Sequence, residues 1–499
     1  MLLLGIDLGT SSVKVSVVDA ETQKTIASAQ YPETETGIIS KEPGWAEQSP
    51  QTWWNDVQHA IKKLNATGFF NPKDIGAIGI AYQMHGLVCI DKNKNVLRNS
   101  IIWCDSRAVR IGEKAFKKIG YDKCLSRLLN SPGNFTASKL SWVKENEPAV
   151  YEKIDKIMLP GDYIAMQLTG EATTSISALS EGIFWDFKKN KLSKDVFEYF
   201  GFDKEIIPEI HPVFGSHGSL KKEIADALSL TEGIPVAYKA GDQPNNALSL
   251  NVMEPGEVAA TAGTSGVIYG VSDQLNYDKQ SRINSFAHVN HKEDFNRIGV
   301  LLCINGCGIT NRWIKNSIGA NTDYDKLNEE ASKIRPGSEG VSVIPFANGA
   351  ERMLNNKLVG AHVLNLDWNL HTPAHVYRAG QEGIAFAFRY GLDIMRKNGI
   401  EPTVIRAGKA NMFLSKVFKK AFVNVLDTPV ELYNSDGSVG AALGAGIGSN
   451  VFVSEKDAFS NMKPEEKTEP LQQSIYNDLY QAWKEKLNKV IKMNEPVED

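Results

Sequence analysis

The stretch GIDLGTSSVKV, Gly5 to Val15, predicts a β-hairpin with a glycine at its tip. Apolar residues lead into Asp7, and apolar and other residues alternate from Val13 to Val17 as they do in a strand. Between the two expected strands lies a short glycine-containing loop. We take this hairpin as the element around which the rest of the chain is organised.

The loop of this hairpin has the composition of a phosphate-binding loop. Gly9 lets the backbone approach a ligand closely, so the amides and hydroxyls of Thr10, Ser11 and Ser12 can converge on phosphate oxygens. Asp7 would lie beside them, and a carboxylate repels a phosphate unless a cation lies between the two. The pairing therefore predicts Mg²⁺ held by Asp7 through water. The alternative is an ordinary hairpin whose turn has the sequence GTS.

A second stretch, about 250 residues further on, repeats the pattern. Glu257 to Gly270 reads EVAATAGTSGVIYG, in which Gly263-Thr264-Ser265 stands between two apolar runs. A tripeptide recurs easily by chance, but its recurrence together with flanking strands indicates two related halves. We therefore expect two phosphate-binding loops, one in each half of the chain.

Length and composition indicate a two-domain globular protein. The 499 residues suggest two domains of roughly 250 residues, and 42% apolar and 23% charged residues are ordinary for such a protein. No stretch approaches the ~18 apolar residues of a membrane span, and the N-terminal MLLLGID lacks the basic flank of a signal peptide, so we expect a cytoplasmic protein without a membrane partner. A net charge of −4 creates no field that attracts polyanions, so no nucleic-acid partner is expected.

The five cysteines are odd in number and scattered along the chain, which argues against a disulfide framework. Cys303 and Cys307 are spaced as Cx3C within an apolar stretch, and no second ligand pair accompanies them. We therefore expect buried thiols here rather than a zinc site.

Two polar clusters follow apolar strands, which is where α/β proteins bind their ligands. Met84 and His85 come after the expected strand Ile75 to Ile80 and could offer a sugar a flat apolar contact beside a neutral donor or acceptor, although a lone histidine is more often structural. Asp105 and Arg107 follow a second apolar run. They could form a local ion pair or bind hydroxyl groups, and both alternatives stay open.

Asp242 stands at the end of the apolar segment that begins at Ile234. A carboxylate at this strand end could face the space between the two phosphate loops. It could also be a helix N-cap, which Pro244 two residues later favours, and both interpretations can hold at once.

Periodicity predicts several helices. Ser49 and Pro50 would be the N-cap and first residue of one helix, and Asn134 to Pro148 reads as a capped helix ended by Pro148. Val439 to Gly448 is a helix of small residues that either lines an adenine slot or packs closely on its neighbours. A C-terminal helix with one apolar stripe is predicted by residues that recur in strides of four, namely Leu471, Ile475, Leu479, Trp483, Leu487 and Ile491.

The sequence resembles the FGGY carbohydrate kinases from Gly5 to about residue 448. The motifs that carry the resemblance are GIDLGTS at 5–11, GWAEQSPQTWW at 44–54, YQMHG at 82–86, IIWCDSR at 101–107, FTASKLSWV at 135–143, AGDQ at 240–243, AGTSGV at 262–267, GAERM at 349–353 and HVYRAGQEG at 375–383. Each motif alone is weak, whereas nine in the family's order are specific.

The resemblance implies an α/β chain with the two-domain ATPase fold of actin, hexokinase and the heat-shock chaperones (ribonuclease H-like). Residues 1–240 would form an N-terminal domain with the sugar site and the first phosphate loop. Residues 241–499 would form a C-terminal domain with the second phosphate loop and the adenosine site. A small-molecule sugar and ATP would meet with Mg²⁺ in the interdomain cleft. The implied reaction is phosphorylation of the 5-hydroxyl of D-xylulose, and a homodimer stays open.

By resemblance, Asp242 matches the family's catalytic base and Asp7 its metal-associated aspartate, and both would hold Mg²⁺ through water. Met84 and His85 match the pair that contacts the ketose. The other implied sugar-binding residues are Gln83, Trp103 and Asp105, with Asp242 itself. The implied nucleotide-binding residues are Gly9, Thr10, Ser11, Lys14, Gly263, Thr264, Ser265, Gly408 and Asn411.

Two departures from the family's pattern bear on specificity. The segment 406–409, Arg-Ala-Gly-Lys, keeps only Gly408 of a motif that usually has three glycines, and this affects the expected nucleotide affinity and base preference. Residues 243–246 read Gln-Pro-Asn-Asn where relatives with the Met-His pair commonly have Asn and then alanines, and this affects the expected sugar. The alternatives are a kinase for ribulose, fuculose, gluconate, rhamnulose or glycerol, and a non-catalytic ATP-driven scaffold of the same fold.

Overall fold

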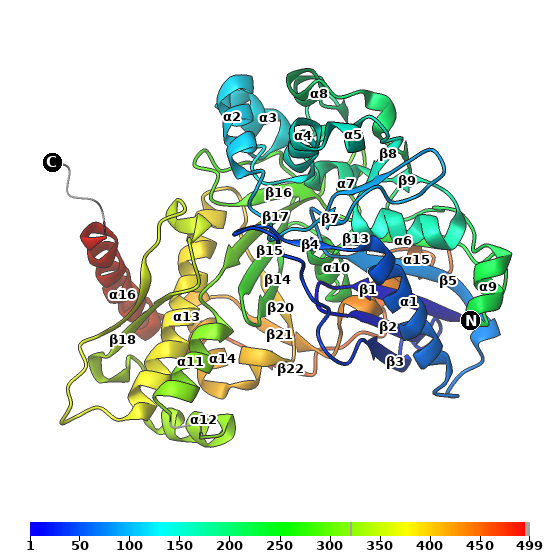
Figure 1. Cartoon of the computed structure of the whole chain (residues 1–499). Helices are drawn as coiled ribbons and strands as arrows, with labels where there is room; N and C mark the ends of the chain where they lie inside the picture. The colour runs from blue at the N-terminus through cyan, green and yellow to red at the C-terminus, as the bar shows by residue number, and fades with distance from the viewer. Residues whose placement is uncertain (320–321, 495–499) are drawn as a thin grey trace.

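Two mixed β-sheets, one in each lobe, form the frame of the molecule (Figure 1). The computed structural model describes residues 1–319 and 322–494. The first sheet has the order β13-β5-β1-β2-β3 and contains β1 (Leu2–Leu8), β2 (Val13–Asp19), β3 (Thr25–Tyr31), β5 (Ile75–Tyr82) and β13 (Val236–Gly241). The second has the order β16-β17-β15-β14-β20-β21-β22 and contains β14 (Glu257–Ala262), β15 (Gly266–Ser272), β16 (Asn284–Ala287), β17 (Ile298–Ile304), β20 (Val404–Gly408), β21 (Val430–Tyr433) and β22 (Glu466–Thr468).

The helices surround these two sheets. Their bounds are α1 (Pro50–Asn65), α2 (Val109–Ile119), α3 (Tyr121–Leu128), α4 (Thr136–Asn146), α5 (Pro148–Tyr151), α6 (Pro160–Thr169), α7 (Ile176–Glu181), α8 (Lys194–Phe200), α9 (Lys222–Leu228), α10 (Asp242–Ser249), α11 (Gly308–Ser317), α12 (Tyr324–Lys333), α13 (Pro373–Arg396), α14 (Lys416–Leu426), α15 (Gly437–Gly448) and α16 (Gln473–Met493). Short two-stranded pairs are β4 (Glu47–Gln48) with β7 (Ser100–Ile101), β6 (Val88–Ile90) with β8 (Lys156–Met158), β9 (Thr173–Thr174) with β12 (Glu209–Ile210), β10 (Trp185–Asp186) with β11 (Lys191–Leu192), and β18 (Ser342–Phe346) with β19 (Gly360–Leu364).

The two sheets repeat one topology. In the first, β2 is antiparallel to β1 and β3, while β5 is parallel to β1 and β13 is parallel to β5. In the second, β15 is antiparallel to β14 and β17, while β20 is parallel to β14 and β21 is parallel to β20. The order β13-β5-β1-β2-β3 therefore matches β21-β20-β14-β15-β17 strand for strand. Both predicted hairpins are present, and the prediction of two related α/β halves is confirmed.

The helix that follows the last strand of each repeat packs between the lobes. α10 follows β13, and α15 follows β21. Although α15 comes late in the chain, it packs on β1, β5, β13 and β2 of the first sheet, and α10 packs on α15 (Figure 1). The expected domain boundary at residue 240 stays a prediction, because the first sheet is covered by a helix from beyond it.

Strand alternation decides which residues of β1 face α15. Leu4, Ile6 and Leu8 share a core with α1 and α6, and Leu3 belongs to the separate core formed with α15. Successive side chains of a strand point to opposite faces, so Asp7 lies on the same face as Leu3. The acidic side chain of β1 is thus directed toward α15.

Glycine allows α15 to approach this face closely. Gly5 of β1 and Gly79 of β5 are partners in the sheet register. A Cβ atom would lie 1.8 Å from the Ser438 oxygen at Gly5 and 1.9 Å from the Ala441 oxygen at Gly79. Since no side chain fits in these gaps, the two glycines set the distance between helix and sheet.

The small residues of α15 serve the same contact from the helix side. A Cβ atom at Gly440 would lie 2.6 Å from the Cβ of Ser249, and one at Gly448 would lie 1.8 Å from the Ala237 oxygen. Of the two alternatives for this segment, close packing is the one that the structure shows.

Three local expectations are corrected by the structure. Asp242 is not an N-cap: Gly241 is the N-cap of α10 and Asp242 is its first residue, which keeps the carboxylate at the strand end. The helix expected over Asn134 to Pro148 ends before Pro148 as predicted, but it begins at Thr136 and has no side-chain cap. Cys307 is buried as expected, but Cys303 is exposed, because alternation along β17 turns it away from the core that holds Leu302 and Ile304.

The C-terminal helix has one apolar stripe, as predicted, and Leu479, Trp483, Leu487 and Ile491 pack on the core, but its first turns bury other residues than those predicted. Its buried residues are Tyr476, Tyr480, Trp483, Leu487 and Val490. Leu471 precedes the helix and Ile475 is 50% exposed. A helix has 3.6 residues per turn, so a strict stride of four drifts around its surface, whereas alternating steps of four and three stay on one side. By contrast, α1 begins at Pro50 with the Ser49 side chain as its cap, as predicted.

Within residues 1–319 and 322–494, no helix is both long and apolar enough to cross a membrane.

The contact between α15 and the first sheet should tolerate no side chain at Gly79. We expect Gly79→Ala to lower the free energy of unfolding by about 1–3 kcal/mol, because the added methyl group overpacks the contact with Ala441. Urea unfolding followed by tryptophan fluorescence would measure this. Gly37→Ala is the matched control, because a Cβ atom there meets nothing within 4 Å. Equal stability of the two variants would contradict the role of Gly79.

Candidate active site

Asp7 and Asp242 lie at one edge of the first sheet. Asp7 is the penultimate residue of β1, and Asp242 follows β13 directly. β5 lies between these strands, and its last residue, Tyr82, pairs with both Leu8 and Gly241. The carboxyl ends of three parallel strands therefore bring the two aspartates to the same place.

Burial and like charge disfavour the ionised forms of both aspartates. Burial raises the pKa of Asp242 to about 7, and the negative charge of Asp7 adds to this rise. Burial likewise raises the pKa of Asp7 to about 6, with a further rise from Asp436 that Lys14 partly offsets. Lys14 is the register partner of Asp7 on β2. Perturbed carboxyl groups of this kind are typical of catalytic sites.

Asp436 is a site neighbour that the sequence analysis missed. It caps α15, since its Oδ1 accepts hydrogen bonds from the amides of Ser438 and Val439 at 2.9 and 3.1 Å. A Cβ atom at Gly437 would lie 2.3 Å from Oδ2 of Asp7, so the N-terminus of α15 lies directly against that carboxylate. An aspartate before Gly-Ser and a run of small residues is an N-cap pattern, and this pattern could have identified it.

The predicted first phosphate loop is hydrogen-bonded to two predicted sugar-site residues. The Trp103 indole donates to Oγ1 of Thr10 at 3.0 Å, and Thr10 Oγ1 donates to Gln83 at 3.4 Å. Gln48, from the 44–54 motif, donates to the Thr10 carbonyl at 2.8 Å and accepts from Gln83 at 3.0 Å. Trp103 is 53% exposed, so its ring is available to a ligand. The structure thus brings Thr10, Gln83 and Trp103 together, with Gln48 as their support.

His85 is held in an unusual backbone conformation beside Met84. Its φ is +62°, in the left-handed region that non-glycine residues rarely adopt. The Lys139 ammonium donates to its carbonyl at 2.7 Å, and its ring Nδ1 donates to the Glu181 carbonyl at 3.1 Å. Burial lowers the pKa of His85 to about 3, so the ring is neutral. This agrees with the neutral donor or acceptor expected at this position.

Asp105 and Arg107 form an ion pair, the first of the two alternatives left open. Nη2 of Arg107 lies 2.7 Å from Oδ2 of Asp105, and both side chains are buried. Oδ2 also accepts from the amide of Ala46 at 2.5 Å, and Oδ1 accepts from the Arg107 amide at 2.8 Å. Both carboxylate oxygens are therefore engaged by the protein. The pair fixes the loop that carries Trp103.

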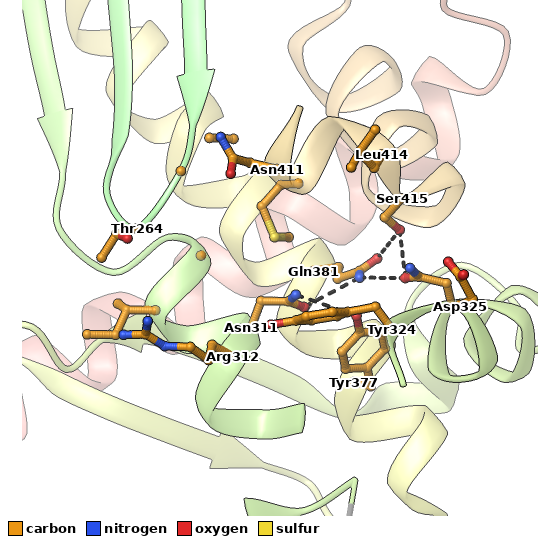
Figure 2. A pocket seen from close by; sticks show the side chains of 16 residues that line it. Thr264, Asn311, Arg312, Tyr324, Asp325, Tyr377, Gln381, Asn411, Leu414 and Ser415 are labelled. Atoms are coloured by element: carbon orange, nitrogen blue, oxygen red, sulfur yellow. Dashed lines mark hydrogen bonds between the residues drawn. The ribbon is translucent and has the colours of Figure 1, made fainter. Parts of the chain in front are cut away.

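The predicted second phosphate loop lies at one end of a cavity of about 390 Å³ in the second lobe. The cavity is lined by Ala262, Gly263, Thr264, Gly308, Ile309, Asn311, Arg312, Tyr324, Asp325, Asn328, Tyr377, Gln381, Asn411, Met412, Leu414 and Ser415. Figure 2 shows Thr264 at one side of this cavity, Ser415 and Asp325 at the other, and the rings of Tyr324 and Tyr377 near each other along it. Of the predicted nucleotide residues, Gly263, Thr264 and Asn411 line the cavity.

The far end of the cavity carries a hydrogen-bonded set of amides that the sequence analysis missed. Ser415 Oγ donates to Gln381 at 2.8 Å or to Asn328 at 2.9 Å, and Gln381 Nε2 donates to Asn328 at 3.0 Å (Figure 2). Nδ2 of Asn311 donates to the Tyr377 hydroxyl at 3.4 Å. Gln381 lies within the 375–383 motif, so that motif was the available signal.

The altered glycine motif has a structural use in this chain. Arg406 pairs with Glu257 at 2.9 Å and with Glu431 at 3.3 Å, and so bridges β14, β20 and β21. Gly408 ends β20 beside Ser435, and a Cβ atom there would lie 3.8 Å from the Ser435 oxygen. Gly408 does not line the cavity, whereas Asn411 does.

The paired aspartates have the chemistry of a Mg²⁺ site that is completed by water and phosphate. Carboxylate oxygens are the ligands that Mg²⁺ prefers, and it usually binds through one or two carboxylates together with phosphates and waters. In the described ranges no group of three or more His, Cys, Asp or Glu side chains could hold a metal ion. Two carboxylates that repel each other are suited to bind a cation between them, and phosphate oxygens and water would supply its remaining ligands.

The family models match nearly the whole chain. The model of the N-terminal domain of the FGGY family of carbohydrate kinases matches residues 2–249, and the model of its C-terminal domain matches residues 258–449. The chain belongs to the FGGY family and is therefore a carbohydrate kinase, and family members use ATP as phosphoryl donor.

Named relatives span the same length. The xylulose kinase of Haemophilus influenzae is 30% identical over 458 residues, 89% of this chain and 90% of that protein. The xylulose kinase of Escherichia coli is 28% identical over 481 residues, 96% of this chain and 95% of that protein. Among solved structures, the "xyloylose kinase" of Brucella ovis has a TM-score of 0.88 at 26% identity and covers 99% of this chain and 100% of its own. The gluconate kinase of Lactobacillus acidophilus shares the fold, with a TM-score of 0.89 at 20% identity and 99% of each chain covered.

The raised pKa of Asp242 predicts a pH-dependent stability. A carboxyl group with a raised pKa keeps its proton in the folded protein at pH values where the unfolded chain has released it. The contribution of Asp242 to the free energy of unfolding therefore falls as pH rises from 3.8 to about 7, and it does not fall further above about 7. In metal-free buffer at pH 8 we expect Asp242→Asn to unfold at a higher temperature than the wild type, with the difference vanishing toward pH 3.8.

Thermal unfolding measured across this pH range tests the expectation. Asp273→Asn, at an exposed position just after β15, is the control and should track the wild type at every pH. A wild type that is more stable than Asp242→Asn at pH 8 would show that the carboxylate is not destabilised by its surroundings.

Proposed function

We propose that the protein transfers the γ-phosphoryl group of ATP to the 5-hydroxyl of D-xylulose, with Asp242 as the general base. The observation that carries this proposal is the pairing of Asp242 with Asp7 at the edge of the first sheet, close to Met84 and the Thr10 loop. The similarity to two curated xylulose kinases along most of the chain supports the choice of sugar.

In the proposed reaction the sugar oxygen attacks the γ-phosphorus in line. As the new O–P bond forms, the bond between the γ-phosphorus and the β,γ-bridging oxygen breaks and ADP leaves. The hydroxyl proton passes to the carboxylate of Asp242. A base whose pKa is about 7 is suited to this transfer near neutral pH. When bound, Mg²⁺ held by Asp7 and Asp242 through water would neutralise charge on the phosphate oxygens.

The two hairpin loops would position the triphosphate. We place the nucleotide base and ribose in the 390 Å³ cavity and the phosphates toward Thr264 and Thr10. The amides of Gly308 and Ile309 donate to the Gly263 and Thr264 carbonyls at 2.9 and 3.2 Å, which ties the second loop to the start of α11. A loop held in this way is organised before the ligand binds, which favours positioning and electrostatic stabilisation of the transferred group.

The sugar would lie against Met84, His85 and the exposed ring of Trp103. Gln243, the first residue of the segment that departs from the family's pattern, hydrogen-bonds Asp242 and lowers its pKa. Because this departing segment contacts the proposed base directly, another ketose or polyol stays the second candidate acceptor. The paired carboxylates weigh against a non-catalytic scaffold. We keep the cytoplasm as the proposed compartment because ATP is the donor, and a homodimer stays a prediction.

Loss of the proposed base should abolish transfer and spare nucleotide binding. We expect Asp242→Asn to lower kcat by about 10²- to 10⁴-fold, because the attacking hydroxyl then has no proton acceptor. A coupled assay of ADP formation measures this, and titration calorimetry should find ADP affinity within about twofold of the wild type. Asp273→Asn should keep full activity. Near-normal turnover by Asp242→Asn would reject its role as base.

An acceptor panel tests the sugar. We expect D-xylulose to give the highest kcat/KM among D-xylulose, D-ribulose, L-fuculose, L-rhamnulose, D-gluconate and glycerol, because the site pairs an apolar contact at Met84 with the neutral ring of His85. Mass spectrometry of the product would check that one phosphoryl group was added. A higher kcat/KM for another acceptor would identify that compound as the substrate instead.

A further inference from the structure

Glu181, the last residue of α7, is buried with one carboxyl oxygen unpaired. The Tyr82 hydroxyl donates to its Oε1 at 2.8 Å, and the side chain is only 2% exposed. Its Oε2 is buried and has no hydrogen-bond partner in the part of the chain that the structure describes. An unpaired buried polar atom costs free energy, so such an atom in a folded protein requires an explanation.

The unpaired oxygen lies among the residues assigned to the sugar. Oε2 of Glu181 is 3.6 Å from Nδ1 of His85. A Cβ atom built on Gly241 would lie 3.3 Å from this oxygen and 2.6 Å from Cγ of Met84, so Glu181 and Met84 meet at the residue that precedes Asp242. None of these neighbours pairs with Oε2: Met84 is apolar, and Nδ1 of His85 already donates to the Glu181 carbonyl.

We propose that Glu181 is a specificity-determining residue whose Oε2 binds a hydroxyl group of the phosphoryl acceptor beside Asp242. The inference rests on the proposed function and names one further contact by which the site would recognise its sugar. A sugar hydroxyl supplies what the site lacks, a small polar group that can pair with Oε2 in a place closed to the solvent. The short distances from Oε2 to His85 and to Gly241 would place this hydroxyl beside the other residues that contact the sugar.

The protein holds Glu181 firmly in place. Ser177 Oγ donates to the Ala287 carbonyl at 2.9 Å, and Ser180 Oγ accepts from the Ala287 amide at 2.9 Å. These bonds fasten α7, which belongs to the first lobe's half of the chain, to β16 of the second sheet. A carboxyl group fixed between the lobes loses little entropy when it binds a ligand.

Electrostatics suits the proposed role. Burial raises the pKa of Glu181 well above its ordinary value, and the negative charge of Asp242 raises it further. A protonated carboxyl group can both donate to and accept from a sugar hydroxyl, and it adds no negative charge next to the transferred phosphoryl group. A neutral amide of the same shape should therefore replace it well.

The test compares Glu181→Leu, which keeps the volume, with Glu181→Gln, which keeps the polar group. For each variant and the wild type, kcat and KM are measured with D-xylulose, its C3 epimer D-ribulose and its C4 epimer L-ribulose. We expect Glu181→Leu to raise KM for D-xylulose about tenfold to a hundredfold with a smaller change in kcat, and to narrow the preference over at least one epimer tenfold or more. Glu181→Gln should keep that preference within about threefold.

Tyr82→Phe is the matched control. It removes the hydrogen bond to Oε1 and leaves Oε2 in place, so it should lower the thermal midpoint but keep the epimer preference within about threefold. Should Glu181→Leu fail to fold, Glu181→Ala takes its place in the comparison.

Two failures can be told apart. A wild type that consumes ATP with none of the three sugars would overturn the proposed acceptor, and this inference with it. If the wild type is active and Glu181→Leu has the same KM and epimer preference, the role of Glu181 alone is overturned. The same holds if Tyr82→Phe changes KM and epimer preference as much as Glu181→Leu does.

Discussion

The structure depends on the close contact between α15 and the first sheet. Gly5 and Gly79 lie side by side in the sheet, and a side chain at either position would collide with the backbone of α15. The contact brings a helix from the far end of the sequence onto the strand that carries Asp7. It also aligns α10, which begins at Asp242 and packs on the same helix. The two repeats are therefore coupled through α10, which begins at Asp242, and α15, which Asp436 caps.

This packing creates the chemistry of the site. Asp7 is partly buried under the N-terminus of α15, and Asp242 is partly buried near Asp7, so each carboxylate has limited access to water and faces negative charge. A helix N-terminus favours negative charge, which partly offsets the cost of keeping Asp7 there. Carboxylates that neither water nor a positive side chain stabilises fully are suited to bind a cation and to accept a proton.

The sequence predicted the parts of the site that lie in local motifs. Thr10 and Thr264 follow strands and precede strands, and glycine with hydroxyl residues marks each loop, so short-range pattern was sufficient. Ser49 and Pro50 identified the start of α1 for the same reason. Asp436 lies in an N-cap pattern and Gln48 lies in a motif, but neither signal shows what the residue contacts. Their places in the site, like that of Glu181, come from partners far away in the chain. Only the start of the α16 stripe, at Leu471 and Ile475, was wrong, because a stride of four ignores the drift of the helix.

The sequence by itself determined the two repeated hairpins, the family and the position of Asp242 at a strand end, because these follow from alternation, glycine placement and the order of motifs. Tertiary structure alone decided that α15 crosses to the first sheet and that Asp105 pairs with Arg107. It alone left Oε2 of Glu181 unpaired beside His85. The physical reason is that burial, charge repulsion and hydrogen-bond satisfaction depend on distances between residues that are remote in sequence, and no local pattern records those distances.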